Sequence, residues 1–165
     1  EQDSVGGVIE CVVTGMPAGV GEPCFDKLDA NLAQAILSIG AVKGFEIGDG
    51  FRAAGARGTE NNDAFVNRGN GVEKETNHSG GVLGGISDGS PIVFRAAVKP
   101  TPSVAATQHT VNKKGENIEI SIHGRHDPAI IRRICPVLDS VTALVLCDLL
   151  AQRFGTDYFI KGAGR

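Results

Sequence analysis

Glycine restricts the fold of this chain more than any other residue, because it fills 23 of the 165 positions. Glycine adopts left-handed backbone conformations and lets the backbone approach other groups closely. The densest segment, residues 78–89, contains Gly-Gly pairs that a hairpin does not require. Such pairs indicate backbone lying very close to a flat ligand or to another backbone segment. Tight turns between strands are the plainer alternative, since the segment contains neither G-x-G-x-x-G nor a loop ending in Gly-Lys-Ser/Thr.

The overall composition is that of an ordinary globular protein, with 41% hydrophobic and 21% charged residues. A net charge of −3, no tryptophan and one tyrosine argue against a nucleic-acid-binding surface. The four cysteines form no CxxC pair, and a domain of this size does not need disulfides, so we expect a reduced, intracellular protein. The apolar stretch at residues 137–150 is too short to span a bilayer, and we expect no membrane association.

The pattern of apolar residues predicts strands at residues 8–13, 42–47 and 92–98, and an alternating strand at residues 118–122. The first of these is nearly all β-branched, which predicts burial on both faces. A helix is expected after Asp26 as its N-cap, with Gly40 at the C-cap position.

A second helix is predicted at residues 136–154, apolar on nearly all sides and therefore buried in a layered structure. Between the predicted strands, residues 51–75 form a long polar excursion, which is typical of a mobile or functional segment. No repeat or linker divides the sequence, so we expect one α+β unit over residues 1–165.

Two short clusters could bind an anion. The first follows the strand at residues 92–98 and reads Lys99, Pro100, Thr101, Pro102 and Ser103, one cation and two hydroxyls on a rigid backbone. A phosphate or a polar ring edge would suit these donors, although an ordinary strand end with an exposed lysine is an equally good interpretation.

The second cluster is Gly124-Arg125-His126-Asp127-Pro128. Arg125 could clamp a phosphate or carboxylate, and Asp127 could accept a proton. An Arg–Asp ion pair that stabilises a turn is the structural alternative. The histidines have no partners at a convincing metal-ligand spacing, and no activated serine or cysteine is apparent, so we predict no metal site and no nucleophilic catalysis.

The order of these segments resembles the chorismate synthase family over nearly the whole chain. The resemblance rests on Asp3-Ser4-Val5-Gly6-Gly7, on Gly-Glu-Pro-Cys-Phe-Asp-Lys-Leu-Asp-Ala from Gly21 and on Ala-Val-Lys-Gly-Phe-Glu-Ile-Gly-Asp-Gly-Phe from Ala41. It continues through Asn77-His78-Ser79-Gly80-Gly81, Lys99-Pro100-Thr101 and the Arg-His-Asp-Pro cluster. The chain resembles only the C-terminal part of the family, and it has no initiator methionine, so we expect a fragment.

The resemblance implies a partial β-α-β sandwich in which antiparallel sheet layers pack against long buried helices. It also implies the reaction of the complete enzyme, a lyase of the shikimate pathway in aromatic amino acid biosynthesis. That enzyme converts 5-enolpyruvylshikimate 3-phosphate to chorismate and phosphate by anti-1,4-elimination. It requires reduced FMN, and NADPH only where the enzyme reduces its own flavin. A cytoplasmic homotetramer is expected, with no nucleic-acid partner.

The family resemblance assigns the site residues as follows. Asp127 takes the catalytic role, near flavin N5, and Arg125 faces both flavin and substrate. The remaining flavin-binding positions are Gly40, Ala41, Gly84, Lys99, Pro100, Thr101, Pro102 and Ser103. Gly40 stands where the family often has asparagine, and Pro102 replaces a common serine, which puts those flavin contacts in question.

Three hypotheses about function therefore stand. The first is a chorismate synthase fragment that is inactive alone, because the N-terminal histidines and arginines of the family have no counterpart here. The second is a structural and assembly module of that enzyme, with an apolar face that drives association. The third is an unrelated module that binds a phosphate ligand.

Overall fold

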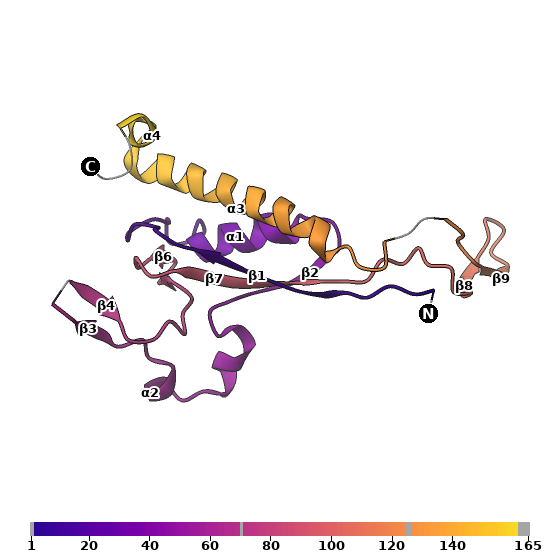
Figure 1. Cartoon of the computed structure of the whole chain (residues 1–165), viewed down its shortest axis with the longest axis horizontal. Helices are drawn as coiled ribbons and strands as arrows, with labels where there is room; N and C mark the ends of the chain where they lie inside the picture. The colour runs from indigo at the N-terminus through magenta and orange to yellow at the C-terminus, as the bar shows by residue number, and fades with distance from the viewer. Residues whose placement is uncertain (1, 70, 125–126, 162–165) are drawn as a thin grey trace.

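A computed structural model describes residues 2–69, 71–124 and 127–161 of the chain. Its centre is a three-stranded antiparallel sheet in the order β1 (Gly7–Val13), β7 (Ile92–Val98), β2 (Val42–Ile47). Helices α1 (Leu28–Leu37) and α3 (Ile131–Phe154) lie over one face of this sheet (Figure 1). This arrangement agrees with the predicted α+β class, and the three predicted central strands are confirmed.

The sheet is buried on one face only. In β1, Ile9 and Cys11 point into the core, whereas Val8 and Val12 on the other face are 64% and 54% exposed. The same alternation runs along β7, where Phe94 is fully buried and packs against Phe45 of β2 at 5.3 Å between ring centroids. The predicted burial of β1 on both faces is therefore wrong, because the helices cover a single face of the sheet.

Helix α1 packs on the sheet through Leu28, Leu32 and Ile36, which are completely buried. The predicted caps of this helix are wrong at both ends, since the N-cap is Lys27 rather than Asp26 and the C-cap is Ser38 rather than Gly40. The first helical N–H, at Leu28, donates instead to the carbonyl oxygen of Gly85 at 2.9 Å. A backbone carbonyl from a distant turn thus satisfies the start of the helix.

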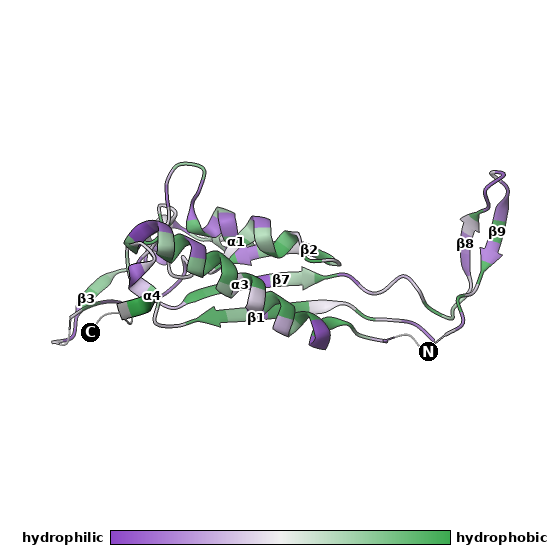
Figure 2. Cartoon of the chain, turned by 90° about the horizontal axis from the view of Figure 1, so that it is seen from above, coloured by the Kyte–Doolittle hydropathy of each residue, from purple (hydrophilic) through white to green (hydrophobic). Residues whose placement is uncertain are grey.

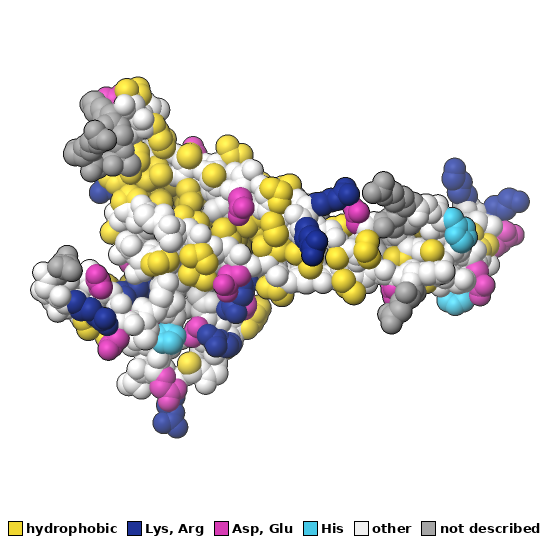
Figure 3. All heavy atoms as spheres, viewed as in Figure 1, with side chains coloured by type: hydrophobic (Ala, Val, Ile, Leu, Met, Phe, Trp, Pro, Cys, Tyr) yellow, Lys and Arg dark blue, Asp and Glu magenta, His cyan; other side chains and the backbone are white. Residues whose placement is uncertain are grey.

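Helix α3 begins at Ile131, five residues before the predicted start, and contains Pro136 in its second turn. One stripe of the helix is buried, as at Leu138, but Leu144 on the other side is 71% exposed. Figure 3 shows hydrophobic side chains gathered along α3 on one face of the molecule. The expectation of burial on nearly all sides is therefore wrong, because one side of the helix packs on α1 and β1 and the other faces outward.

By its length and apolar composition alone, α3 also meets the criteria for a membrane-crossing helix. A core helix of a globular protein meets the same criteria, and the buried stripe of α3 forms part of the central hydrophobic core. The four cysteines are unpaired, as expected from the sequence.

The polar excursion contains regular structure. It begins with the 3-10 helix η1 (Gly50–Gly55) and the short helix α2 (Gly58–Asn61), followed by the hairpin of β3 (Phe65–Asn67) and β4 (Val72–Lys74). The glycine-rich segment then forms a second small hairpin, from β5 (Val82–Leu83) and β6 (Ile86–Ser87).

A further hairpin, of β8 (Gln108–Val111) and β9 (Asn117–Ile120), extends beyond one end of the central sheet (Figure 2). The alternating pattern predicted this strand correctly, but all four residues of β9 are exposed. At the opposite end, α3 is followed by the short helix α4 (Asp157–Lys161).

Candidate functional site

Most of the predicted site residues meet at one end of the central sheet, where β7 ends. Lys99 directly follows β7, and its backbone N–H donates to the carbonyl oxygen of Ala41 at 2.9 Å. Ala41 and Gly40 lie in the short connection from α1 to β2. We call this end, formed by residues 40–41, 99–103 and 127, the open end of the sheet.

Ala41 has a backbone conformation that is unusual for a residue with a side chain. Its φ is +71°, in the left-handed region, whereas neighbouring Gly40 does not have positive φ. A left-handed conformation costs a non-glycine residue about 1 kcal/mol or more. Strained backbone of this kind is concentrated at functional sites.

The first residues of the chain join the two predicted clusters at the open end. The Ser4 hydroxyl donates to the carbonyl oxygen of Thr101 at 2.6 Å, and the N–H of Val5 donates to the carbonyl oxygen of Pro128 at 2.8 Å. A Cβ on Gly6 would lie 2.4 Å from the carbonyl oxygen of Val98, so only glycine fits there. Residues 4–6 thus lie between the segment after β7 and the segment before α3.

Thr101 carries the one hydroxyl among the described residues that is buried and has no hydrogen-bond partner. A buried hydroxyl without a partner is destabilising by about 1–3 kcal/mol, so such groups call for an explanation. Lys99 is exposed, and Ser103 is half-buried. A hydroxyl that can still form a hydrogen bond, two positions after an exposed lysine, suits a polar, anionic ligand.

Asp127 lies beside a hollow of about 330 Å³ that is lined in part by Ser4, Val104 and Gly124. Its carboxylate accepts a hydrogen bond from Arg133 Nη2 at 3.2 Å and forms an ion pair with Arg133 Nε at 3.0 Å. Sequence reasoning had allowed an Arg–Asp ion pair here, with Arg125 as the partner. Arg125 and His126 lie outside the described residues, and the pair that the structure describes is formed by Arg133 in the first turn of α3.

Gly84 is the one described residue of the predicted site that lies away from the open end. Its segment packs near the start of β7, where a Cβ on Gly81 would lie 2.5 Å from the carbonyl oxygen of Pro91. The seven residues of β7 separate this point from Lys99, a span of about 20 Å at the usual rise of a strand. A Cβ on Gly84 would meet nothing within 4 Å, so this position borders open space.

The glycine pairs can now be explained. A Cβ on Gly80 would lie 2.4 Å from the backbone nitrogen of Gly48, and a Cβ on Gly85 would lie 2.4 Å from the side chain of Lys27. The close approach of backbone is therefore the correct interpretation for Gly80 and Gly81, whereas the tight turn is correct for Gly84 and Gly85, which join β5 to β6. The neighbours are other segments of the same chain.

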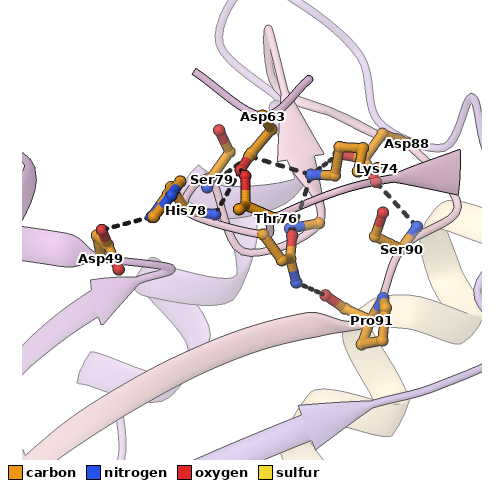
Figure 4. A network of polar contacts seen from close by, with 11 residues as sticks. Asp49, Asp63, Lys74, Thr76, His78, Ser79, Asp88, Ser90 and Pro91 are labelled. Atoms are coloured by element: carbon orange, nitrogen blue, oxygen red, sulfur yellow. Dashed lines mark hydrogen bonds and ion pairs between the residues drawn. The ribbon is translucent and has the colours of Figure 1, made fainter. Parts of the chain in front are cut away.

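At the start of β7, buried charges form a network that sequence reasoning missed (Figure 4). The Lys74 side chain is 2% exposed, and its Nζ donates to Asp63 at 3.3 Å, Asn77 at 3.0 Å and Asp88 at 2.7 Å. We call this region, residues 48–49, 63, 74–80 and 88, the closed end of the sheet. Nothing in the alternation of Val72-Glu73-Lys74 distinguishes Lys74 from an exposed lysine.

Asp63 holds the loop after β4 in place. Its carboxylate accepts hydrogen bonds from Lys74, from the Thr76 hydroxyl and from the backbone N–H groups of His78 and Ser79. Burial raises the pKa of Asp63, but these hydrogen bonds outweigh burial and hold the pKa well below its usual range. Asp63 is therefore charged at neutral pH, although its side chain is 2% exposed.

His78 and Asp49 form a hydrogen-bonded pair beside this network. The Nδ1 atom of His78 lies 2.8 Å from Asp49 Oδ2, and Arg52 donates to the other oxygen of the same carboxylate. These hydrogen bonds, from Arg52 and then from His78, hold the pKa of Asp49 below its usual range. The glycines on both sides of Asp49, Gly48 and Gly50, indicate that another segment approaches the backbone closely here. Nothing in the sequence links Asp49 to His78.

No group of three or more metal-ligating side chains converges within residues 2–69, 71–124 and 127–161. The side chains at the two ends carry ammonium, guanidinium, hydroxyl, imidazole and carboxylate groups, which can recognise anions and transfer protons.

Comparison with known proteins links this geometry to one family. The family model of chorismate synthase matches residues 1–151. The chain is 61% identical over 96% of its length to the chorismate synthase of Agathobacter rectalis, and 68% identical over 90% of its length to that of Lachnospira eligens. A crystal structure of chorismate synthase matches 96% of the chain with a TM-score of 0.76 at 31% identity.

The chain spans 45% and 40% of the lengths of these two curated relatives and 41% of the solved structure. The match of the family model over most of the sequence, together with the shared fold, settles the relationship. The chain belongs to the chorismate synthase family.

Proposed function

We propose that this chain is part of an enzyme that converts 5-enolpyruvylshikimate 3-phosphate to chorismate and phosphate by anti-1,4-elimination. In this reaction an allylic C–O bond to phosphate breaks, a ring C–H bond breaks, and a new C=C bond forms. Family membership supports this activity, and the enzyme is then a lyase of aromatic amino acid biosynthesis. The observation that carries the proposal is the convergence of Ala41, Lys99, Thr101 and Asp127 at the open end.

The open end fits reduced FMN, because the buried Thr101 hydroxyl lacks a partner and the left-handed Ala41 places its carbonyl against Lys99. We infer that Lys99, Thr101 and Ser103 contact the polar edge or phosphate of the flavin, with Gly40, Ala41, Pro100 and Pro102 shaping the backbone around it. Arg125 and Gly84 complete the proposed set. Bound reduced FMN supplies electron density transiently as the allylic phosphate leaves, with no net redox change.

We assign three roles to the side chains of this chain: they bind the ligands, orient them and accept a proton. The Lys99 ammonium neutralises an anionic ligand, and the Thr101 hydroxyl donates a hydrogen bond that it makes to no described residue. Asp127 supplies a proton-accepting carboxylate at the rim of the hollow, and Arg133 orients this carboxylate through one hydrogen bond and an ion pair. Gly84 lies about 20 Å away along β7, so we assign it to a different part of the flavin site.

This chain offers few cations for two anionic ligands, and its relatives are more than twice as long. We infer that the chain alone is inactive, and that the rest of the enzyme supplies the other acid–base groups and cations. The proposal includes a single unit over residues 1–165, a cytoplasmic homotetramer as the complete enzyme, and NADPH only where the enzyme reduces its own flavin.

A second function, as an assembly module, is favoured by one specific observation. Val137 and Leu144 on the outer side of α3 are 46% and 71% exposed, and Leu37 of α1 is 47% exposed. Apolar side chains gathered in this way are typical of a surface that another polypeptide covers. Sedimentation tests this role, because a monomer at high concentration would argue against it.

Titration of FMN into the chain, followed by flavin fluorescence, tests the main proposal. We expect saturable quenching that weakens about tenfold in Lys99→Ala and in Thr101→Val, and that stays unchanged in Lys114→Ala at the tip of the β8–β9 hairpin. Absence of quenching at any FMN concentration up to about 100 times a micromolar Kd would contradict a flavin site at the open end of this chain.

A further inference from the structure

We propose that Ser4 is a positioning residue for the flavin site at the open end of the sheet. The Ser4 hydroxyl donates to the carbonyl oxygen of Thr101 at 2.6 Å and thereby fixes the backbone from which the Thr101 side chain projects. Ser4 itself does not touch the flavin and acts only through Thr101. The inference rests on the proposed function, because Thr101 is the residue that we expect to donate a hydrogen bond to FMN.

The segment that follows β7 cannot continue the central sheet. Pro100 and Pro102 have no backbone N–H group, so neither residue can donate to a neighbouring strand. The N–H of Lys99 donates to the carbonyl oxygen of Ala41 at 2.9 Å, and this bond holds the segment only at its start. The backbone of Thr101, between the two prolines, therefore has to be fixed by donors from other segments.

Two side chains from other segments donate to carbonyl oxygens here. The Ser4 hydroxyl donates to Thr101, and Nε2 of Gln108 donates to Pro102 at 2.8 Å. The Ser4 bond is partly buried and joins residues 97 positions apart, whereas the Gln108 bond is exposed and joins residues six positions apart. A hydrogen bond is electrostatically stronger where water is excluded, so Ser4 is the donor that fixes Thr101.

Ser4 lies on a segment that is itself held in place. The N–H of the next residue, Val5, donates to the carbonyl oxygen of Pro128 at 2.8 Å. A Cβ on Gly7 would lie 2.2 Å from Cδ1 of Ile131, so the backbone here lies directly against the first residue of α3. A donor on such a fixed segment loses little conformational entropy when it holds its acceptor.

The direction of the Ser4 hydrogen bond leaves the side chain of Thr101 available to a ligand. The Ser4 hydroxyl has one hydrogen, which it donates to the carbonyl oxygen of Thr101, and the Thr101 hydroxyl remains without a described partner. Because the backbone of Thr101 is fixed, its side chain is oriented before a ligand binds, and less conformational entropy is lost on binding. Removal of the Ser4 hydroxyl should therefore weaken FMN binding through Thr101.

Ser121 provides a matched control for Ser4. Its hydroxyl also donates to a backbone carbonyl oxygen at 2.6 Å in a partly buried position, but the acceptor is Ala105, four residues beyond Thr101. Both serines thus tie the segment after β7 to another part of the chain. If such a tie only stabilised the fold, Ser4→Ala and Ser121→Ala would have the same effect on flavin binding.

A double-mutant cycle measured by FMN fluorescence tests the proposal. We expect Ser4→Ala to weaken FMN binding about fivefold, Ser4→Thr to restore most of the affinity because it keeps a hydroxyl, and Ser121→Ala to bind FMN like the unmodified chain. Thr101→Val should weaken binding about tenfold, and the double variant Ser4→Ala with Thr101→Val should weaken it no further. Independent effects would multiply to about fiftyfold, and that outcome would overturn the proposal.

NMR of the threonine methyl groups gives a second readout that needs no flavin. The Thr101 methyl resonance, identified by its loss in Thr101→Val, should shift in Ser4→Ala and stay in place in Ser121→Ala. The resonance of Thr110, on the exposed strand β8, should shift in neither variant. Both serine variants should lower the midpoint of urea unfolding by similar amounts, so general destabilisation would not explain a difference between them. An unchanged Thr101 resonance in Ser4→Ala overturns the proposal.

The outcomes distinguish this inference from the proposed function. If the unmodified chain does not quench FMN fluorescence, the flavin site at the open end is contradicted, and the role of Ser4 is contradicted with it. If the unmodified chain binds FMN and Ser4→Ala binds it equally well, the proposed function is intact and the role of Ser4 alone is overturned.

Discussion

The two ends of β7 use polar residues in opposite ways. At the closed end, Lys74, Asp63 and Asp88 are buried and pair with one another. At the open end, the Thr101 hydroxyl is buried without a partner, and Asp127 is in an ion pair whose arginine is 75% exposed. The closed end is complete within this chain. At the open end, the Thr101 hydroxyl can still form a hydrogen bond. This difference distinguishes a structural support from a binding site.

The strongest test of the closed end is Lys74→Met. Removal of the lysine leaves Asp63 and Asp88 buried without their cation, which should lower the free energy of unfolding by about 3–5 kcal/mol. Urea denaturation measures the loss, and Lys114→Met on the exposed hairpin tip is the matched control. A loss below about 1 kcal/mol would place Lys74 in the class of exposed ion pairs and remove the contrast between the two ends.

Replacing Gly80 and, separately, Gly84 by alanine compares how closely the chain packs around these two positions. Gly80→Ala places a Cβ against the backbone of Gly48 and Val93, at 2.4 and 2.7 Å, whereas Gly84→Ala meets nothing within 4 Å. Both have positive φ, so both should lose about 1–2 kcal/mol from backbone strain. The clash should add about 1–3 kcal/mol in Gly80→Ala alone. Equal losses in thermal or urea unfolding would contradict the close approach at the closed end.

Acid should destabilise the closed end first. The pKa of Asp63 is lowered in the folded state, and so is that of Asp88, where hydrogen bonds from Lys74 and Ser90 outweigh the opposite effect of burial. A carboxyl group with a lowered folded pKa stabilises the fold above its unfolded pKa, about 3.9, and loses this contribution as the pH falls toward the folded value.

The free energy of unfolding should therefore fall as the pH is lowered from about 5 to 2. In Asp63→Asn the protein should be less stable at pH 7 and should show a shallower acid slope. Asp26→Asn, at an exposed aspartate, is the control. An unchanged slope in Asp63→Asn would mean that this carboxyl does not contribute to the acid sensitivity.

The sequence predicted the two ends unequally, for physical reasons. Strands β2 and β7 and the apolar face of α1 followed from local periodicity, because Leu28, Leu32 and Ile36 repeat at helical spacing. The N-cap of α1 was missed because the carbonyl of Gly85, 57 positions after Leu28, satisfies the first helical N–H. Lys74 was missed for a similar reason, since its burial depends on Asp63 and Asp88 from other segments.

The burial of α3 could not be judged from its composition alone. Leu138 and Leu144 are both apolar, and the fold rather than the residue type decides that one is buried and the other exposed. For the site, the sequence supplied Lys99, Thr101 and Asp127 as candidates through motifs. Their meeting through Ser4 and Val5 required the structure, because those contacts join residues almost a hundred or more positions apart.

The smallest predicted effect concerns the open end and has opposite signs for stability and binding. Thr101→Val keeps the shape of the side chain and removes a buried hydroxyl that has no described partner. Because an unsatisfied buried group is destabilising, this variant should be more stable by about 1 kcal/mol, while its affinity for FMN falls. Thr110→Val on the exposed β8 strand should change neither quantity. Lower stability in Thr101→Val would mean that the hydroxyl stabilises the fold of the free chain, and the open end would then be as complete as the closed one.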